Sequence, residues 1–382
     1  MEHSRESRRA ISRRLARWYG GHKRDLPWRR TDDPYAIWLS EVMLQQTTVE
    51  VIAPRWARFL SRFPAVEALA RAPERAVLAE WGGLGYYARA RNLHRAAKAV
   101  AEAGAFPRTL DGLRALPGVG PYTAAAVGSI CFGIPEPAVD GNVVRVFCRL
   151  YGLRLDPRAP ATLARVRALA RPLVPARNPG GHNQAVMELG ALVCTPRAPR
   201  CGACPLRTLC RAAASGKPEG FPRRPRRATP RTIHLVGGIV EREKKFLLVE
   251  DRTLVRGHLC VPLFPVRDGE RSANVLRRGW ERIARRSAVS LEAVATLRHS
   301  VLDRRYQIAL FTFKEKSPVP PLRRPGAALG SGSEQKIILL SPLQISRRAH
   351  GGLLLKVLAA RRAHRAVVRR RLKASDRGEQ PR

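Results

Sequence analysis

The chain has 382 residues, with 71 Lys and Arg against 30 Asp and Glu, and its formal net charge is +41. This length allows two domains with a core each, and no run of about 18 or more apolar residues predicts a membrane span. A positive charge of this size favours a polyanionic partner, of which nucleic acid is the most abundant. Coding bias toward Arg on solvated faces is the alternative, but it does not explain the shortage of acids.

The N-terminus is rich in Arg and has no apolar segment of the signal-peptide kind. An organellar transit segment is disfavoured because Glu2 and Glu6 interrupt the basic residues. We therefore expect a monomeric bacterial protein of the cytoplasm that associates with the nucleoid.

Residue patterns divide the chain into four consecutive regions. Residues 5–212 carry Ala, Leu and Arg patterns broken by Pro and Gly, and predict an almost entirely helical domain. Residues 213–231 have the Pro, Gly, Lys and Arg content of a linker. Residues 232–345 predict a small α+β domain, and residues 346–382 predict a basic C-terminal tail, whose helix over 346–372 either docks on DNA or is solvated. We favour the solvated tail.

The first chemically suggestive element is the helix predicted from Pro34 to Thr47. Glu41 lies in it among strongly apolar neighbours. Burial of this kind disfavours the charged carboxylate, raises its pKa and lets it hold a proton. The alternative is an ordinary surface acid on an amphipathic helix.

A Leu-Pro-Gly-Val-Gly segment at residues 116–120 separates two helical stretches. Gly118 and Gly120 permit the positive φ angles of a tight turn, and around Val119 the backbone N–H groups can approach an anion closely. With the N-terminus of the next helix they form a phosphate cradle, which is the helix–hairpin–helix pattern of non-specific DNA binding. A packing corner between two helices is the alternative.

Twenty residues later, Asp140 stands immediately before another predicted helix. As an N-cap it would accept backbone N–H bonds, which favour its ionised form. An ordinary structural N-cap is the alternative. Paired with Glu41, however, Asp140 suits cleavage of an N-glycosidic bond, in which one acid protonates the leaving base and the other faces positive charge on the sugar.

Four of the seven cysteines are spaced Cys194-x6-Cys201-x2-Cys204-x5-Cys210. In a cytosolic chain such spacing predicts a metal site and not a disulfide framework. A four-cysteine zinc site and a four-iron cluster are both compatible with four thiolates, although zinc sites usually pair two C-x2-C knuckles and this segment has one. The other three cysteines lie in apolar runs and predict small buried residues.

Between the cysteines and the C-terminus, one helix is predicted over residues 274–286 and a loop rich in Pro, Gly and Ser over 318–335. Strands are predicted over residues 232–240, 245–250, 295–302, 306–313 and 336–340.

Five segments together with the cysteine spacing resemble the adenine DNA glycosylases of the MutY type, a branch of the endonuclease III-like helix–hairpin–helix superfamily. The resemblance covers residues 8–212 in order, and several segments match this branch specifically. The segments are SEVMLQQT (40–47), WGGLGYYARARNLH (81–94), LPGVGPYTAAA (116–126), VDGNVVRV (139–146) and NQAVMELGALVC (183–194), with the six-two-five spacing of the cysteines as the sixth feature.

The resemblance implies a base excision enzyme that removes adenine paired with 8-oxoguanine or guanine in double-stranded DNA. It implies that Glu41 protonates adenine at N7, that Asp140 stabilises the oxocarbenium-like sugar with or without a covalent bond, and that a [4Fe–4S] cluster occupies the four cysteines. Tyr122 stands where the bifunctional relatives have the lysine that forms a Schiff base, so a monofunctional enzyme is implied.

Further site residues are implied by the same resemblance. A flipped base is required for attack on its sugar bond, and wedging side chains help to offset the lost stacking. The residues implied are Asn142, which lines the catalytic site with Tyr122; Arg24, Leu26, Trp28 and Glu188, which contact the flipped adenine; and Gln46 and Tyr86, which wedge into the duplex.

The C-terminal region resembles the Nudix-like (MutT-like) domain that reads 8-oxoguanine in this family. The Nudix hydrolase box is absent, so diphosphate hydrolysis is not expected. The Phe-Ser-His loop of typical members is replaced by Ser300-Val301-Leu302 after Arg298-His299, and their Trp-Gly-Gly segment by residues 255–258. Two other functions stay open: a thymine or uracil mismatch glycosylase of the same superfamily, and a DNA-binding relative without catalysis.

Overall fold

The computed structural model describes residues 4–45, 47–223, 231–242, 244–250, 259–284, 290–301, 304–313, 337–346 and 352–375. Contacts between Cα atoms divide the chain into two compact units. The helical unit comprises residues 1–77 and 86–226, and the sheet unit comprises residues 78–85 and 227–382. Among the described residues, no helix has the length and apolar content needed to cross a bilayer.

Helices account for all the regular structure described before residue 224, as the sequence predicts. In chain order they are α1 (Arg5–His22), η1 (Pro27–Arg29), α2 (Pro34–Met43), α3 (Val49–Arg62), α4 (Val66–Arg71), α5 (Glu74–Glu80), α6 (Tyr87–Ala103), α7 (Leu110–Ala115), α8 (Pro121–Phe132), α9 (Gly141–Tyr151), α10 (Pro160–Ala170), η2 (Arg171–Leu173), α11 (Pro179–Leu192), η3 (Cys201–Ala203), η4 (Arg207–Leu209), α12 (Arg211–Ala214) and η5 (Pro218–Gly220).

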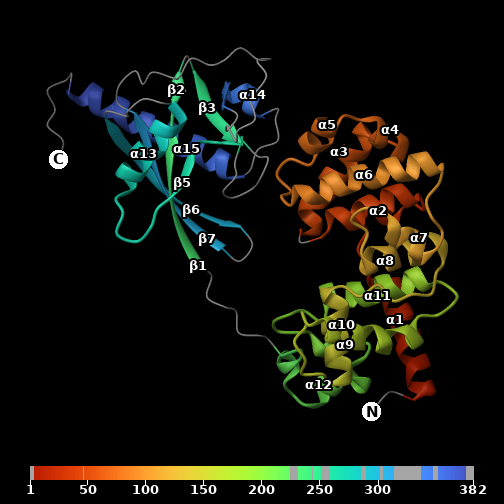
Figure 1. Ribbon diagram of the computed structural model, residues 1–382. Coiled ribbons are helices and arrows are strands. Elements are labelled where there is room, and N and C mark those ends of the chain that lie inside the picture. Colours follow the sequence, from red (N-terminus) through yellow and green to blue (C-terminus); the bar gives the residue numbers. More distant parts are fainter. Residues whose placement is uncertain are drawn as a thin grey trace. The chain divides into compact units, whose positions relative to one another are not determined.

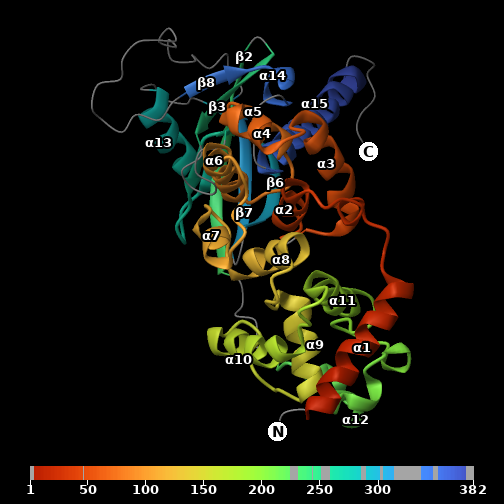
Figure 2. The same ribbon diagram turned by 90° about the vertical axis from the view of Figure 1, so that its right-hand side faces the viewer.

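The helical unit has two lobes, which can be followed in Figures 1 and 2. Helix α1 packs against α11, which also contacts α9, so the start of the chain joins the lobe formed by the last helices. Helices α2 to α8 form the other lobe, and the contact between α8 and α11 joins the two. This arrangement brings the ends of α2, α8, α9 and α11 toward one region.

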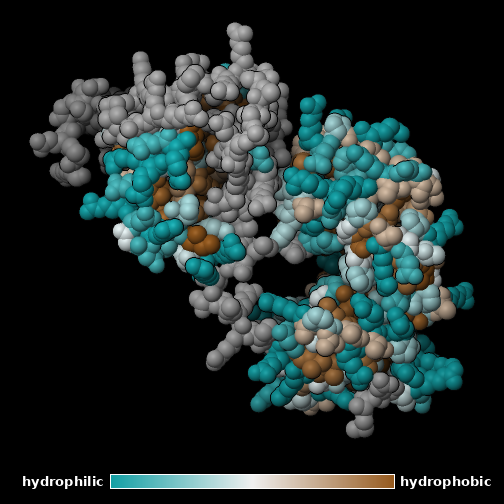
Figure 3. All heavy atoms as spheres, viewed as in Figure 1, coloured by the Kyte–Doolittle hydropathy of each residue, from teal (hydrophilic) through white to brown (hydrophobic). Residues whose placement is uncertain are grey.

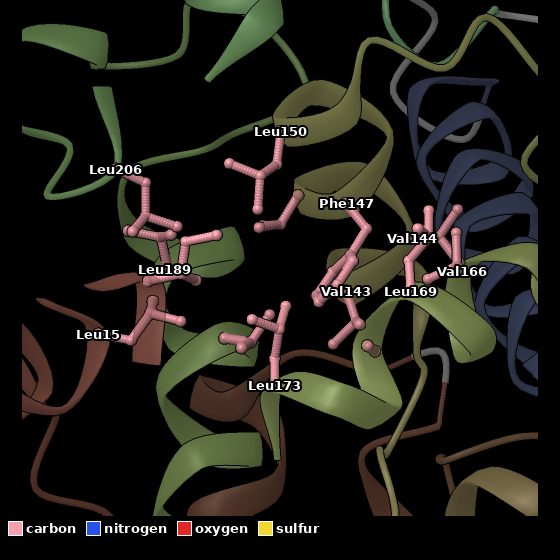
Figure 4. Close-up of a cluster of buried hydrophobic side chains, with 14 of the residues drawn as sticks. Leu15, Val143, Val144, Phe147, Leu150, Val166, Leu169, Leu173, Leu189 and Leu206 are labelled. Carbon is pink, nitrogen blue, oxygen red and sulfur yellow. The ribbon is translucent and has the colours of Figure 1, made fainter. Parts of the chain in front are cut away.

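A buried apolar cluster holds the first of these lobes together (Figure 4). Helix α1 contributes Ile11, Leu15 and Trp18, whose spacing of four and three residues places them on one helical face. Leu206 comes from the cysteine-containing segment. Because each fully buried aliphatic side chain contributes about 1.5–3 kcal/mol, the cluster fixes α9 and α11 relative to α1. Its other labelled members are Val143, Val144, Phe147, Leu150, Val166, Leu169, Leu173 and Leu189.

The sheet unit is an α+β fold, as predicted. One sheet has the strand order β5-β1-β7-β6, in which β1 and β7 are parallel and the other pairs antiparallel; in the second sheet, β3 pairs with β2, β4 and β8. The elements are β1 (Arg231–Ile239), β2 (Glu241–Arg242), β3 (Lys245–Glu250), β4 (Leu259–Cys260), β5 (Leu263–Pro265), α13 (Ser272–Ala284), β6 (Leu291–Val301), β7 (Arg304–Phe313), β8 (Ile337–Leu340), α14 (Pro342–Ser346) and α15 (Gly352–Ser375). The predicted loop over residues 318–335 lies outside the described residues.

The described part of the C-terminal segment begins as a packed helix and not as a solvated tail, which corrects the prediction from sequence over the first half of α15. The first half of α15 buries Leu353, Leu354 and Val357 in the core beneath the sheets. Its basic residues are partly neutralised as well, since Arg365 Nη2 lies 2.9 Å from Glu241 Oε1. The run of Arg and Lys residues indicates a solvent-exposed helix, but the leucines that precede this run determine where the helix packs.

The linker is also shorter than predicted. Phe221 is buried, and the Nε of Arg149 donates to the carbonyls of Pro218 and Phe221 at 3.0 and 3.1 Å. Residues 213–222 are therefore part of the helical unit, whose visible face is covered mostly by hydrophilic side chains with small hydrophobic patches (Figure 3).

Candidate active site

A cavity of about 1050 Å³ lies in the helical unit. It brings together residues from widely separated segments of the chain, among them most of those predicted from sequence. The predicted residues that line it are Arg24, Leu26, Trp28, Glu41, Gly118, Gly120, Tyr122, Asp140, Asn142 and Glu188. Val119 and Tyr86 lie outside the lining, and Gln46 lies outside the described residues.

Glu41 is the acid of the cavity whose environment favours a proton. It lies near the end of α2, whose N-terminus is capped by Asp33, and only 8% of its surface is exposed. Burial raises the pKa of Glu41 to about 6; a hydrogen bond from Tyr122 opposes this shift and the charge of Asp140 adds to it. Glu41 is thus partly protonated near neutral pH, as the sequence predicts.

Tyr122 supports Glu41 from helix α8. Its hydroxyl lies 2.6 Å from Oε2 of Glu41, to which it donates, and 3.4 Å from Sδ of Met187. Burial, followed by the charge of Glu41, raises the pKa of Tyr122 well above its ordinary value. The phenol therefore keeps its proton and remains a donor to Glu41.

Asp140 is the N-cap of α9, as predicted. Its Oδ1 accepts from the backbone N–H of Val143 at 2.7 Å, and its Oδ2 accepts from Nδ2 of Asn142 at 2.8 Å. These bonds favour the carboxylate, but burial outweighs them and raises the pKa of Asp140. The hydrogen bonds that the sequence predicts are thus present and act in the predicted direction, but an N-cap that lines a cavity also loses water, which opposes them.

Asn142 is held in turn by Arg145, a residue that sequence reasoning missed. Nη2 of Arg145 donates to Oδ1 of Asn142 and to the carbonyl of Gly190, both at 2.8 Å, and its Nε donates to the carbonyl of Cys194 at 2.7 Å. A Cβ on Gly190 would lie 2.6 Å from the Cβ of Asn142, so only glycine fits there. Arg145 thereby ties the support of Asp140 to the start of the cysteine-containing segment.

Glu188 lies in the same cavity as Glu41 but in the opposite electrostatic environment. Its carboxylate accepts from the backbone N, Nε and Nη2 of Arg24 at 2.8–2.9 Å and from Nη1 and Nη2 of Arg29 at 3.2 and 2.9 Å. Burial alone would raise the pKa of Glu188, but these bonds lower it to about 2. Glu188 therefore stays ionised and orients two guanidinium groups at the cavity wall.

Arg29 was not predicted from sequence, although it lines the cavity and also lies 5.5 Å from the ring centroid of Tyr19. Its partner is 159 residues away, so no local pattern could indicate the pair. The only available signal was its place directly after Trp28.

Leu26 and Trp28 supply the apolar part of the wall. Both are buried on or beside the short helix η1, and the Trp28 ring meets that of Trp56 edge-on at 6.0 Å between centroids. Because this contact fixes the indole, the cavity has a flat, rigid surface suited to a planar heterocycle.

The hairpin between α7 and α8 has one glycine with a positive φ and not two. Gly118 has a φ of +78°, and a Cβ there would lie 2.6 Å from the Cβ of Asn92. Gly120 has an ordinary φ of −86° and is the N-cap of α8, with open space where a side chain would be. That space leaves the backbone N–H groups of the helix N-terminus accessible, as an anion cradle requires, whereas Val119 is buried and anchors the turn.

The four predicted metal ligands are free thiols. Burial, followed by the charges of Cys194, Cys210 and Cys201, raises the pKa of Cys204 to about 11, which indicates that the four lie near one another. The residues that the structure describes nevertheless contain no group of three or more Cys, His, Asp or Glu side chains arranged to hold a metal ion. Nη1 of Arg149 donates to Sγ of Cys194 at 3.3 Å.

Comparison with known proteins agrees with this geometry. The model of the HhH-GPD superfamily of base excision DNA repair proteins matches residues 39–172. The chain is 44% identical over 228 residues to adenine DNA glycosylase of Homo sapiens, covering 54% of this chain and 42% of that protein. It is 43% identical over 209 residues to adenine DNA glycosylase of Mycolicibacterium smegmatis, covering 54% of this chain and 70% of that protein.

Among solved structures, the chain is similar to a thermostable thymine-DNA glycosylase, with a TM-score of 0.51 and 29% identity over 55% of this chain and 98% of that one. The matched part of the chain spans less than half the length of the human, rat and mouse relatives.

Proposed function

We propose that this chain, which belongs to the family of adenine DNA glycosylases, hydrolyses the N-glycosidic bond of adenine mispaired with 8-oxoguanine or guanine in double-stranded DNA. The observation that carries the proposal is the pair of buried acids in one cavity: Glu41, with a pKa near 6, and Asp140, capped by Val143 and Asn142. One acid holds a proton to give, and the other can face a cation.

In the proposed reaction, the extruded adenine enters the cavity and Glu41 donates its proton to N7. The bond between N9 and C1′ then breaks with its electron pair on the base, which leaves as neutral adenine. Asp140 stabilises the oxocarbenium-like sugar until water adds at C1′ and loses a proton. Neither step needs a co-reactant besides water.

The cavity wall supports a purine as the leaving group. Trp28 and Leu26 offer a flat apolar surface, while Arg24 and Arg29, held by Glu188, offer N–H donors to ring nitrogens. We propose that the hairpin from Gly118 to Gly120 binds a phosphate, and that Tyr86 and Gln46 wedge into the duplex.

We propose a monofunctional enzyme. The position that would carry a nucleophilic amine in a strand-cutting relative is Tyr122, whose hydroxyl is occupied with Glu41 and whose pKa is raised. A phenol cannot form the Schiff base that leads to strand cleavage.

We further propose that Cys194, Cys201, Cys204 and Cys210 hold a [4Fe–4S] cluster. The donor set fits, because four free thiols lie on one short segment and a buried guanidinium, that of Arg149, donates to Sγ of Cys194. Such a group would fix the loop structurally. Iron and labile sulfide in the purified protein, with absorbance near ~400 nm, would support this proposal, and stoichiometric zinc would contradict it.

The test of the main proposal uses three duplexes, with adenine opposite 8-oxoguanine, adenine opposite guanine and thymine opposite guanine. We expect adenine release from the first two. The likeness to a thymine-DNA glycosylase makes thymine release the second candidate, and release of thymine without adenine would replace our proposal with it. No release from any duplex would favour a binding-only relative.

A further inference from the structure

Tyr86 combines two features that rarely occur together in an aromatic residue. Its side chain is 48% exposed, and its backbone has a φ of 47° and a ψ of 51° at the N-cap of α6. A left-handed conformation costs a bulky residue on the order of 1 kcal/mol or more, and such strain concentrates at functional sites. Tyr86 is thus exposed at a backbone conformation that tyrosine rarely adopts.

Arg89 lies one turn into α6, and its guanidinium lies over the Tyr86 ring. Its backbone N–H donates to the carbonyl of Tyr86 at 2.8 Å, and its guanidinium carbon lies 5.5 Å from the centroid of the Tyr86 ring. A cation at this distance attracts the face of an aromatic ring.

The same guanidinium also reaches the helix that carries Glu41. Nη1 of Arg89 lies within hydrogen-bond distance of the carbonyls of Val42, Met43 and Gln45, at 2.8, 3.3 and 2.6 Å. Carbonyls at the C-terminal end of a helix have no partner within the helix, and a cation there also stabilises the helix dipole. Arg89 therefore terminates α2 and holds the segment that follows it.

We propose that Arg89 is a positioning residue that joins Tyr86 to the end of α2, so that insertion of the Tyr86 ring into a duplex places the extruded base in register with Glu41. This inference rests on the proposed function. Arginine suits the role because its planar fork contacts a ring face and several carbonyls at once, which a lysine ammonium cannot do.

The test compares Arg89→Met and Arg89→Lys with a matched control, Arg91→Met. Arg91 lies on the same helix, its side chain is 37% exposed, and its Nε is 3.4 Å from Glu74 Oε1. Two substrates are used under single-turnover conditions with saturating protein: a duplex with adenine opposite guanine, and one with adenine opposite an abasic-site analogue, where the base is already poorly stacked.

We expect Arg89→Met to slow excision from the adenine–guanine duplex roughly tenfold and Arg89→Lys several-fold, with less than about a twofold change on the unstacked substrate. Arg91→Met is expected to match the wild type on both. Equal losses on the two substrates would mean that Arg89 only stabilises α2. Wild-type rates on both would mean that Arg89 stabilises neither α2 nor the Tyr86 ring. Either result overturns the proposal.

Base extrusion is measured separately with 2-aminopurine in place of adenine, since its fluorescence rises when it leaves the stack. We expect Arg89→Met to reduce the rise, and the double variant with Tyr86→Ala to extrude no worse than Tyr86→Ala alone, because the two residues act as a unit. Additive losses would overturn the proposal. This readout needs no bond cleavage, so it remains informative if the wild type fails to release adenine and the proposed function falls.

Discussion

Glu41 and Glu188 line the same cavity and are both almost completely buried, at 8% and 1% exposure. Burial raises the pKa of Glu41 to about 6, whereas two arginines hold the pKa of Glu188 at about 2. Among the described residues, the hydrogen-bond partner of the Glu41 side chain is a neutral phenol, that of Tyr122. Loss of water alone thus does not decide the charge of a buried acid; the charge of its partners does. Within one cavity, glutamate can therefore act as a proton donor at Glu41 and as a fixed anion at Glu188.

The sharpest way to break this comparison is to remove the proton donor. Glu41→Gln keeps the shape of the side chain but cannot transfer a proton, so we expect excision to fall by about 10²–10⁴-fold with duplex binding retained. Single-turnover rates and gel-shift binding measure the two effects. Glu67→Gln, an exposed acid on α4, is the control, and excision by Glu41→Gln at the wild-type rate would remove Glu41 from the mechanism.

The second change removes the fixed anion. Glu188→Gln leaves Arg24 and Arg29 without their carboxylate, and we expect the free energy of unfolding in urea at pH 7 to fall by about 3–5 kcal/mol.

The pH dependence of this loss follows from the direction of the shift. Because the pKa of Glu188 is about 2 in the folded chain and roughly 4.3 in an unfolded one, its contribution is full above about pH 5 and is lost as pH falls toward 2. The difference between variant and wild type should therefore shrink in acid. A difference that is constant with pH would contradict the assigned ionisation.

The third prediction concerns the wild type alone. If Glu41 must be protonated, the single-turnover rate should decline above about pH 6 by roughly tenfold per pH unit, because the pKa of Glu41 is about 6. A pH–rate profile from pH 5 to 9 measures this, and a rate that rises between pH 6 and 8 would exclude Glu41 as the acid.

The smallest predicted effect concerns the hydroxyl of Tyr122, which donates to Glu41. Its hydrogen bond lowers the pKa of Glu41, so Tyr122→Phe should raise that pKa and move the decline in rate to higher pH, by about half to one unit. The same profile, repeated on the variant, measures the midpoint. A midpoint displaced toward acid would show that Tyr122 acts in another way.

Much of this site could be predicted because its signals are local. Asp140 precedes a helix, Glu41 stands among apolar neighbours, and both roles can be recognised within a few residues of sequence. The net pKa of Asp140 could not be predicted, since it depends on water excluded by side chains from α8 and α11. Arg29 and Arg145 were missed because their partners, Glu188 and Gly190, are brought close only by the fold.

The C-terminal region shows the same limit at the level of packing. A run rich in apolar and β-branched residues predicts β3 with the bounds that the structure has, Lys245–Glu250. The sequence predicts a solvated tail in place of α15, because the arginines from Arg361 onward dominate its composition. Whether Leu353 and Leu354 have a surface to bury against depends on the sheets, and composition carries no information about that.

The close approach of Gly118 to Asn92 fixes the spacing between two contacts that we propose with DNA, at the hairpin and at Tyr86. Asn92 lies on α6, six residues after Tyr86, so one helix carries both the exposed ring and the contact that seats the hairpin. At 1.5 Å per residue these points are about 9 Å apart along the helix, close to three base-pair steps of about 3.4 Å. If the hairpin binds a phosphate and the Tyr86 ring wedges into the duplex, as we propose, α6 holds these two contacts at a fixed separation, and the bound phosphate should lie at a constant offset from the wedged step in every sequence context.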